Sequence, residues 1–169
     1  MKKVIIMCGI PGSGKSTWAR EYVKNHEAAY VSRDEIRFSL VQEGEEYFSK
    51  EKEVFKTFVN KIKFWLRSNP VVVVDATHLN PASRLKLFNA LDVTASMQIE
   101  IVWVKVSLET ALSQNELRKG TRAYVPQEVI HNMYDKFVEP EYDEIPTYYD
   151  KIWIVEDGAM ILKEYEEEA

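Results

Sequence analysis

Short apolar runs alternate with longer amphipathic stretches along the whole chain. The runs are rich in β-branched and aromatic residues, as β-strands are. They predict strands at residues 3–8, 28–32, 71–75, 97–106 and 151–155. We expect the first, third and fifth of these strands to be buried on both faces. Because strands that alternate with helical patterns are typical of βαβ units, the sequence predicts an α/β fold in which a mostly parallel central sheet carries helices on both faces.

The longest amphipathic stretch, residues 51–66, places its apolar residues three and four positions apart. That spacing gives a helix one apolar face, which we expect to be core. The stripe consists of Val54, Phe55, Phe58, Val59, Ile62, Trp65 and Leu66. Proline marks two further helices: Asn80 can cap a helix at residues 81–91, and Pro126 starts another in the same way.

Length and composition indicate how many domains the chain forms and in which cellular setting it works. A chain of 169 residues suits one domain, and we expect a single domain over residues 1–169. Its single cysteine, Cys8, cannot form a disulfide within the chain, which favours a reducing, intracellular setting. No apolar run approaches the roughly 18 residues of a membrane span. We therefore expect a cytoplasmic protein without a membrane partner.

The formal net charge is −5, which argues against a protein that sheathes nucleic acid regardless of sequence. That binding mode depends on broad neutralisation of phosphates. Much of the acidity is concentrated at residues 139–144 and 164–168. A basic cleft elsewhere could still admit a nucleic-acid end.

Residues 9–17 directly follow the first predicted strand and match the phosphate-loop pattern G-x-x-x-x-G-K-[ST]. Successive backbone amides at the start of a helix form a nest for anions there. The residues expected to contact the nucleotide are Gly9, Pro11, Gly12, Ser13, Gly14, Lys15, Ser16 and Thr17. A chance glycine-rich turn is the alternative, but strand, loop, Lys-Ser pair and helix occur in order. The motif predicts binding of ATP or another nucleoside triphosphate.

Three side chains of this loop have separate expected roles. Lys15 supplies a positive charge to the β- and γ-phosphates, and the Ser16 hydroxyl is a hard oxygen suited to Mg²⁺, partly through water. Thr17 is expected to reach the α-phosphate. The loop thus predicts the phosphoryl donor and the metal, and it leaves the acceptor open.

Candidate residues for binding the acceptor lie in the segment after the second predicted strand, Ser-Arg-Asp-Glu-Ile-Arg at residues 32–37. Ser32 followed by Glu35 is a capping box, so Asp34 and Arg37 lie on the first turns of one helix and share a face. The carboxylate could accept the proton of an attacking hydroxyl, and the guanidinium could grip a phosphate of the acceptor. An ordinary surface Asp-Arg pair is the alternative.

Polar residues also follow the third predicted strand, at residues 75–81. Asp75 could orient waters on Mg²⁺, although a hydrogen bond that fixes the loop is an equal alternative. Thr77 and His78 are candidates for contact with the acceptor. A lone histidine is more often a capping or packing residue, and that alternative stays open for His78.

A helix expected from about residue 107 leads into a basic segment with a glycine break, which we interpret as a lid at residues 115–125. Arg118 and Arg122 are candidates to stabilise charge on the transferred phosphoryl group, and Lys119 is a candidate nucleotide contact. The alternative is a helix that ends in cations because its C-terminus favours them.

Four segments in order resemble one family, the 5′-hydroxyl polynucleotide kinases of the phage end-healing type in the P-loop phosphotransferase superfamily. They are residues 9–21, 32–37, 75–81 and 118–126. The resemblance implies that Asp34 is the general base on the 5′-hydroxyl and that Arg37 holds a phosphate of the acceptor strand. It also implies that Lys15 and Ser16 contact phosphate and Mg²⁺.

The chain departs from the family pattern at several positions. The family lid usually has two arginines four residues apart, where this chain has Asn115 and Lys119, so Arg118 and Arg122 are the substitutes. His78 stands where asparagine is common in the family. The Asp-x-Asp-x-Thr motif of an acid-phosphatase domain does not occur, so we expect kinase activity without 3′-phosphatase activity.

The sequence therefore predicts ATP-dependent, Mg²⁺-assisted transfer of a γ-phosphoryl group to the 5′-hydroxyl end of DNA or RNA. A kinase for a small molecule or a tRNA-linked hydroxyl on the same scaffold is the first alternative. A nucleotide-dependent switch without dedicated chemistry is the second. The sequence does not indicate an oligomeric state, and it leaves a homo-oligomer open.

Overall fold

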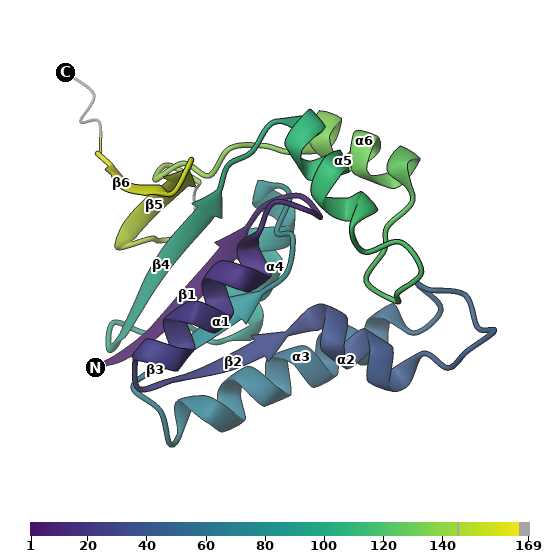
Figure 1. The fold of residues 1–169 in the computed structure, drawn as a ribbon. Helices are drawn as coiled ribbons and strands as arrows, with labels where there is room; N and C mark the ends of the chain where they lie inside the picture. Colours follow the sequence, from purple (N-terminus) through teal and green to yellow (C-terminus); the bar gives the residue numbers. More distant parts are fainter. Residues whose placement is uncertain (145, 166–169) are drawn as a thin grey trace.

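The computed structural model describes residues 1–144 and 146–165 (Figure 1). Within them, six strands form one sheet in the order β2-β3-β1-β4-β5-β6. The strands are β1 (Lys2–Cys8), β2 (Ala28–Ser32), β3 (Val71–Asp75), β4 (Met97–Val104), β5 (Lys151–Glu156) and β6 (Ala159–Lys163). Neighbouring strands from β2 to β5 run parallel, and only the β5–β6 pair is antiparallel. The predicted α/β fold with a mostly parallel sheet is confirmed.

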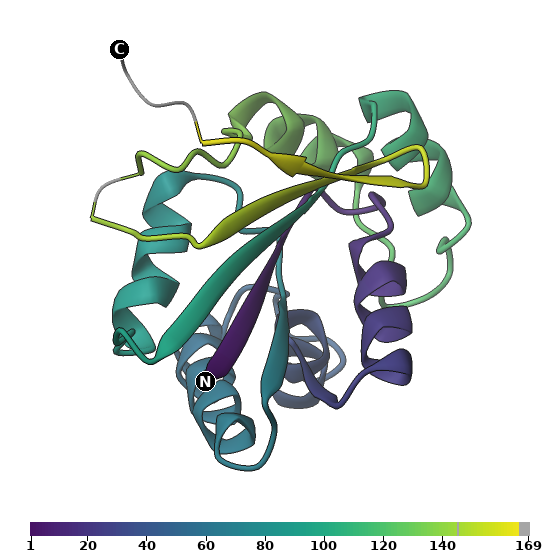
Figure 2. The same cartoon turned by 90° about the vertical axis from the view of Figure 1, so that its left-hand side faces the viewer.

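Helices cover both faces of this sheet, as Figure 2 shows. On one face lies α1 (Lys15–Asn25), and on the other lie α3 (Glu51–Leu66) and α4 (Pro81–Ala90). The remaining helices are α2 (Arg33–Leu40), α5 (Leu108–Glu116) and α6 (Gln127–Lys136). α5 and α6 pack together beyond the carboxyl ends of the strands, against Ile10 of the loop after β1. Several loops therefore meet at that end of the sheet.

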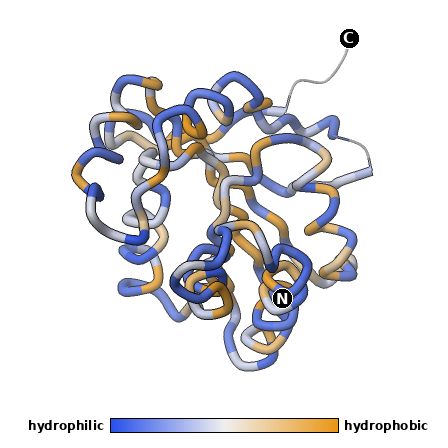
Figure 3. The backbone as a smooth tube through the Cα atoms, turned by 90° about the vertical axis from the view of Figure 1, so that its right-hand side faces the viewer, coloured by the Kyte–Doolittle hydropathy of each residue, from blue (hydrophilic) through white to orange (hydrophobic). Residues whose placement is uncertain are grey.

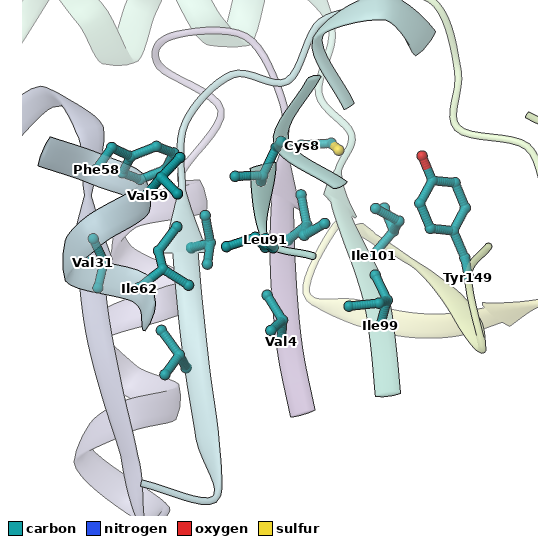
Figure 4. Packing of buried hydrophobic residues seen from close by; sticks show 14 of the residues in the cluster. Val4, Cys8, Val31, Phe58, Val59, Ile62, Leu91, Ile99, Ile101 and Tyr149 are labelled. Carbon is teal, nitrogen blue, oxygen red and sulfur yellow. The ribbon is translucent and has the colours of Figure 1, made fainter. Parts of the chain in front are cut away.

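The period-two alternation of β1 divides the core into two layers. Val4, Ile6 and Cys8 pack toward α3 and α4, whereas Ile5 and Met7 pack toward α1. The layer on the α3 side is the larger, and Figure 4 shows Phe58, Val59 and Ile62 of α3 against the strands. Hydrophobic residues follow the central strands in Figure 3. Burial of both faces explains why β1 and β3 are almost continuously apolar.

The sequence did not predict β6, and the structure corrects details of three other elements, β5, α3 and α6. β5 is not buried on both faces, because it lies beside the edge strand β6 and only Ile152 is buried there. Trp65, expected in the core, is 40% exposed in the last turn of α3 and contacts the ring of Phe64. Pro126 occupies the N-cap position rather than the first position of α6.

Two predictions concern the acidic segments and the membrane. Of the acidic run at residues 164–168, residues 166–168 lie outside the described part of the chain. Glu144, at the end of the other acidic segment, is buried in an ion pair with Arg84. Among the described residues, no helix has the length and apolar character needed to cross a membrane.

Candidate active site

The turn between β1 and α1 has the backbone geometry of an anion-binding loop. Gly12 and Gly14 have φ angles of +84° and +91°, a region that side chains rarely adopt. A Cβ on Gly12 would also clash with the carbonyl oxygen of Ala111, because α5 packs directly on the loop. Gly14 is the N-cap of α1. The glycines of the motif are thus required by conformation and by a close approach.

This loop presents an electropositive, partly unsatisfied surface. The first turn of α1 contains no acidic residue of its own that would offset the positive end of the helix dipole. Lys15 is buried at the start of α1, with 8% of its surface exposed. The buried Ser13 hydroxyl has no hydrogen-bond partner among the described residues. The geometry suits phosphate oxygens, which would accept hydrogen bonds from these groups.

A carboxylate at the end of β3 meets the phosphate loop from the adjacent strand. The Ser16 hydroxyl donates to Asp75 Oδ2 at 2.7 Å, and the Tyr30 hydroxyl donates to the same oxygen. Asp75 is 3% exposed. Burial, followed by the nearby charge of Asp75, raises the pKa of Tyr30, so its hydroxyl stays protonated and remains a donor. The structure therefore fixes Asp75 against the predicted metal ligand Ser16.

The oxygens of Ser16 and Asp75 fit a magnesium ion. Mg²⁺ prefers hard oxygen ligands and usually keeps several waters, with one or two protein ligands and substrate phosphates. Among the described residues, no group of three or more His, Cys, Asp or Glu side chains could hold a metal alone. Ser16 would bind the ion together with the nucleotide, and Asp75 would orient its waters.

The helix α2 brings Asp34 and Arg37 together at the adjacent strand end. Ser32 caps the helix by accepting a hydrogen bond from the backbone N–H of Glu35 at 3.2 Å. Arg37 Nη1 then donates to Asp34 Oδ1 at 2.7 Å. The Asp34 side chain is 61% exposed, whereas that of Arg37 is only 8% exposed. The carboxylate is thus accessible and the guanidinium is held beneath it.

Arg37 is held by a partner, Glu51, that was not predicted from the sequence. Glu51, the first residue of α3, accepts from Arg37 Nε at 2.7 Å and from Nη2 at 3.1 Å. Burial alone would raise the pKa of Glu51, but the hydrogen bonds and charge of Arg37, with the charge of Arg33, hold it below its ordinary value. The Tyr47 hydroxyl accepts a further hydrogen bond from the Arg37 guanidinium, from Nη1 at 3.2 Å. The fork expected to grip an acceptor phosphate is therefore already occupied by a carboxylate.

A second missed residue, Arg33, has donors to spare. Its Nη2 shares Glu51 Oε2 at 3.1 Å, and its buried Nε has no partner among the described residues. The guanidinium lies over the ring of Phe55 at 5.5 Å. Arg33 directly precedes Asp34 in the sequence, and this adjacency was the only available signal. Arg33 lines the cleft, and its guanidinium makes fewer hydrogen bonds to the described residues than that of Arg37 does.

These groups share one cleft with a volume of about 260 Å³. Its wall includes Lys15 and Ser16 from the phosphate loop, Asp34 from α2 and Thr77 from the loop after β3. Thr77 is joined to the phosphate loop because its carbonyl oxygen accepts from the Gly9 N–H at 3.0 Å. Thr17 is exposed on α1 and does not line the cleft. Donor and acceptor residues predicted from separate motifs thus face the same space.

His78 also lines the cleft, but its ring is buried and committed to the fold. Its Nδ1 lies 2.6 Å from the carbonyl oxygen of Met7, and the residue is 5% exposed. Its φ angle of +45° is unusual for a side chain other than Asn, Asp or Gly. Burial lowers the pKa of His78 to about 4, so the ring is neutral near pH 7. A neutral ring cannot attract an acceptor phosphate by charge, and the packing alternative is favoured.

His78→Asn is expected to remove part of the stability loss at acid pH. Between the ordinary pKa of 6.5 and the folded value of about 4, the unfolded chain binds a proton that the folded chain does not. The free energy of unfolding therefore falls as the pH drops through this window, by about 2 kcal/mol between pH 6.5 and 5. Asparagine does not titrate and tolerates a positive φ.

Urea unfolding near neutral pH and at about pH 5 tests this prediction. His131→Asn, on the exposed surface of α6, is the matched control and should retain the acid-dependent loss of the parent chain. An equal loss in the parent chain and in His78→Asn would contradict the pKa given to His78.

The predicted lid residues face in different directions. Arg118 lines the cleft, whereas Lys119 is exposed on the turn that follows α5. Arg122 Nη2 donates to the carbonyl oxygen of Val41 at 3.0 Å, and its guanidinium lies over the ring of Phe38 at 4.9 Å. Of the three predicted cations, Arg118 is the one that lines the same cleft as Lys15 and Ser16.

Asn115, which replaces a family arginine, closes the base of the same segment. It is fully buried, its amide donates to the Val125 carbonyl at 2.7 Å, and its oxygen accepts from the Val125 N–H at 3.0 Å. The two hydrogen bonds fix both ends of the lid segment. Asn115 therefore has a structural role and does not contribute a charge to the cleft.

Comparison with known proteins places this fold and cleft in a family. Residues 4–140 match the AAA_33 family, described as an AAA domain, and the chain belongs to this family. It has the fold of a P-loop kinase, with the phosphate loop, α2 and the segment after α5 around one cleft.

Two relatives resemble the chain in sequence and one solved structure resembles it in fold. The L-seryl-tRNA(Sec) kinase of Methanococcus maripaludis is 29% identical over 142 residues, which cover 81% of this chain. A protein of Autographa californica nuclear polyhedrosis virus, named as a bifunctional polynucleotide kinase/RNA ligase, is 28% identical over 82% of this chain. The structure of the Pnkp1/Rnl/Hen1 RNA repair complex contains a chain with a TM-score of 0.66 and 21% identity, matched over 80% of this chain and 43% of that one.

These matches cover only parts of the relatives. The chain spans 53% of the Methanococcus protein and 21% of the viral protein. The similarity therefore concerns the P-loop kinase domain that they share with this chain.

Proposed function

We propose that this protein transfers the γ-phosphoryl group of ATP to the 5′-hydroxyl end of DNA or RNA. The observation that carries the proposal is the single cleft into which Lys15 and Ser16 face from the phosphate loop and Asp34 faces from α2. The cleft is then lined both by the residues expected to bind the phosphoryl donor and by a carboxylate suited to an acceptor hydroxyl. The viral relative named as a polynucleotide kinase/RNA ligase supports this acceptor class.

In the proposed reaction, Asp34 accepts the proton of the acceptor hydroxyl as its oxygen attacks the γ-phosphorus. The bond to the β-γ bridging oxygen breaks, and ADP leaves. Lys15, Arg118 and the N-terminus of α1 stabilise the negative charge on the transferred group. Mg²⁺ bound with the nucleotide would neutralise charge on the β- and γ-phosphates.

Arg37 acts in this scheme by positioning Asp34. Its guanidinium is fixed by Glu51 and donates to the base from below, so the carboxylate stays in one orientation. Arg33 lines the cleft and, among the described residues, its guanidinium donates to Glu51 alone, so Arg33 is the residue that would contact a phosphate of the acceptor strand.

A second candidate function is phosphorylation of a hydroxyl on a small molecule or on a tRNA-linked group. The observation that favours it is the occupied fork of Arg37, which leaves one fewer cation for a polynucleotide phosphate. The relative named as an L-seryl-tRNA(Sec) kinase agrees with this alternative.

Incubation with γ-labelled ATP and a panel of acceptors separates the two functions. The panel contains 5′-hydroxyl DNA and RNA oligonucleotides, nucleosides, nucleoside 3′-phosphates, free sugars and aminoacylated tRNA. We expect label on the oligonucleotide ends and faster transfer to a nucleoside 3′-phosphate than to the nucleoside. Label confined to nucleosides, free sugars or aminoacylated tRNA, or release of labelled phosphate alone, would refute the proposed function.

A further inference from the structure

Two neighbouring aromatic side chains, Tyr47 and Phe48, stand at the mouth of the cleft. They belong to the segment between α2 and α3, and both line the cleft. Tyr47 is 38% exposed and Phe48 is 50% exposed. Their rings meet edge to face, with centroids 4.7 Å apart. A cleft with polar groups that also exposes two rings is typical of a site that binds a partly apolar ligand.

The pair is held in place by the residues around the proposed base. The Arg37 guanidinium lies 4.8 Å from the centre of the Tyr47 ring and 5.5 Å from that of Phe48. The Tyr47 hydroxyl also donates to Asp34 Oδ1 at 3.4 Å. Because Glu51 fixes Arg37, the two rings are anchored next to the carboxylate. A group attached to a hydroxyl at Asp34 would lie within reach of them.

Charge on the same segment limits what can lie on the rings. Glu43, Glu45 and Glu46 precede Tyr47, and only Glu45 has a lysine partner among the described residues, at 3.5 Å from Lys50. These carboxylates would repel a phosphodiester. They would not repel the uncharged face of a planar ring, which also gains from stacking on aromatic side chains.

We propose that Tyr47 and Phe48 bind the base of the 5′-terminal nucleotide, whose sugar carries the hydroxyl at Asp34. The inference rests on the proposed function and adds a specificity-determining site to it. Every base has a flat π face, so the site accepts all bases and rejects an end that lacks one. Phosphates of the strand then leave the rings toward Arg33 and away from the acidic segment.

Phe48→Ala tests the site with two matched oligonucleotides. One has a normal 5′-terminal nucleotide, and the other has an abasic residue at that position with the same 5′-hydroxyl. We expect Phe48→Ala to raise KM about tenfold for the normal end, the size of a lost base-aromatic stack, with a much smaller change in kcat. For the abasic end, which the parent chain should already bind weakly, the same variant should leave KM unchanged.

Two control variants separate stacking from general damage. Phe64→Ala removes an aromatic ring that is 56% exposed on α3 and does not line the cleft, so its kinetics should equal those of the parent chain. Phe48→Tyr keeps a stacking face and should restore the low KM. An equal effect of Phe48→Ala on both oligonucleotides, or no effect on either, would overturn the inference.

Binding without turnover distinguishes this inference from the proposed function. Fluorescence anisotropy with a non-hydrolysable ATP analogue present compares the affinity for the normal and abasic ends. A preference for the normal end that Phe48→Ala abolishes, without phosphoryl transfer by the parent chain, would retain the base site and refute the proposed function. Equal affinity for the two ends would refute the base site, whether or not transfer occurs.

Discussion

Asp34→Asn is expected to lower the rate of phosphoryl transfer by a factor of about 10² to 10⁴, the usual contribution of a general base. The amide has the size of the carboxylate but cannot accept the proton of the attacking hydroxyl. The Asp34 side chain is 61% exposed, and Glu51 still holds Arg37 in the variant, so the fold and the phosphate loop should be unaffected. Affinity for ATP should therefore remain close to that of the parent chain.

Glu35→Gln is the matched control for this prediction. Glu35 also lies in the first turn of α2, but it is directed to Arg20 at 3.3 Å and does not line the cleft. Initial rates with a saturating acceptor and titration with a fluorescent nucleotide measure transfer and binding separately. If Asp34→Asn retained transfer within a few-fold of Glu35→Gln, Asp34 could not be the base.

Arg84→Met is expected to destabilise the fold by about 3–5 kcal/mol, the cost of breaking a buried ion pair on one side. Arg84 is fully buried, and its Nε and Nη2 donate to Glu144 at 3.0 and 2.6 Å. It also donates to the carbonyl oxygens of His78 at 2.7 Å and Val138 at 3.0 Å. Methionine fills much of the space but leaves the carboxylate and two carbonyl groups without these donors.

Urea unfolding of three variants tests the physical cause. Lys63→Met breaks an exposed pair with Asp92 and should cost less than about 1 kcal/mol. Combining Arg84→Met with Glu144→Leu removes the orphaned charge and should recover part of the loss. A double variant no more stable than Arg84→Met would show that lost packing, and not the unpaired carboxylate, causes the effect.

The local features of the site could be predicted because they depend on residues close in the sequence. The phosphate loop is specified by Gly12, Gly14 and the start of α1, whose conformation nine consecutive residues determine. The cap at Ser32 sets the phase of α2, and a helix places residues three apart on one face. The meeting of Asp34 and Arg37 in one hydrogen bond follows from that phase.

The partners of those residues could not be predicted in the same way. Glu51 lies 14 residues from Arg37, across the exposed segment between α2 and α3, and many acidic residues were equally available. Glu144 lies 60 residues from Arg84 in the sequence, in a segment with several acidic residues, and nothing local indicates which of them pairs with Arg84. Trp65 followed the apolar stripe of α3 but lies in its last turn, so periodicity overestimated its burial.

The sequence by itself determined the α/β fold, the phosphate loop and the face that Asp34 shares with Arg37, because each depends on local backbone preference or on a periodic apolar pattern. Only the tertiary structure decided that Arg37 is held by Glu51, that Arg33 lines the cleft beside it, and that Tyr47 and Phe48 stand at the cleft. Those outcomes depend on which side chains the packed helices bring within hydrogen-bond distance. A charged side chain can pair with any opposite charge that the fold places beside it, and its own sequence neighbourhood does not specify which one.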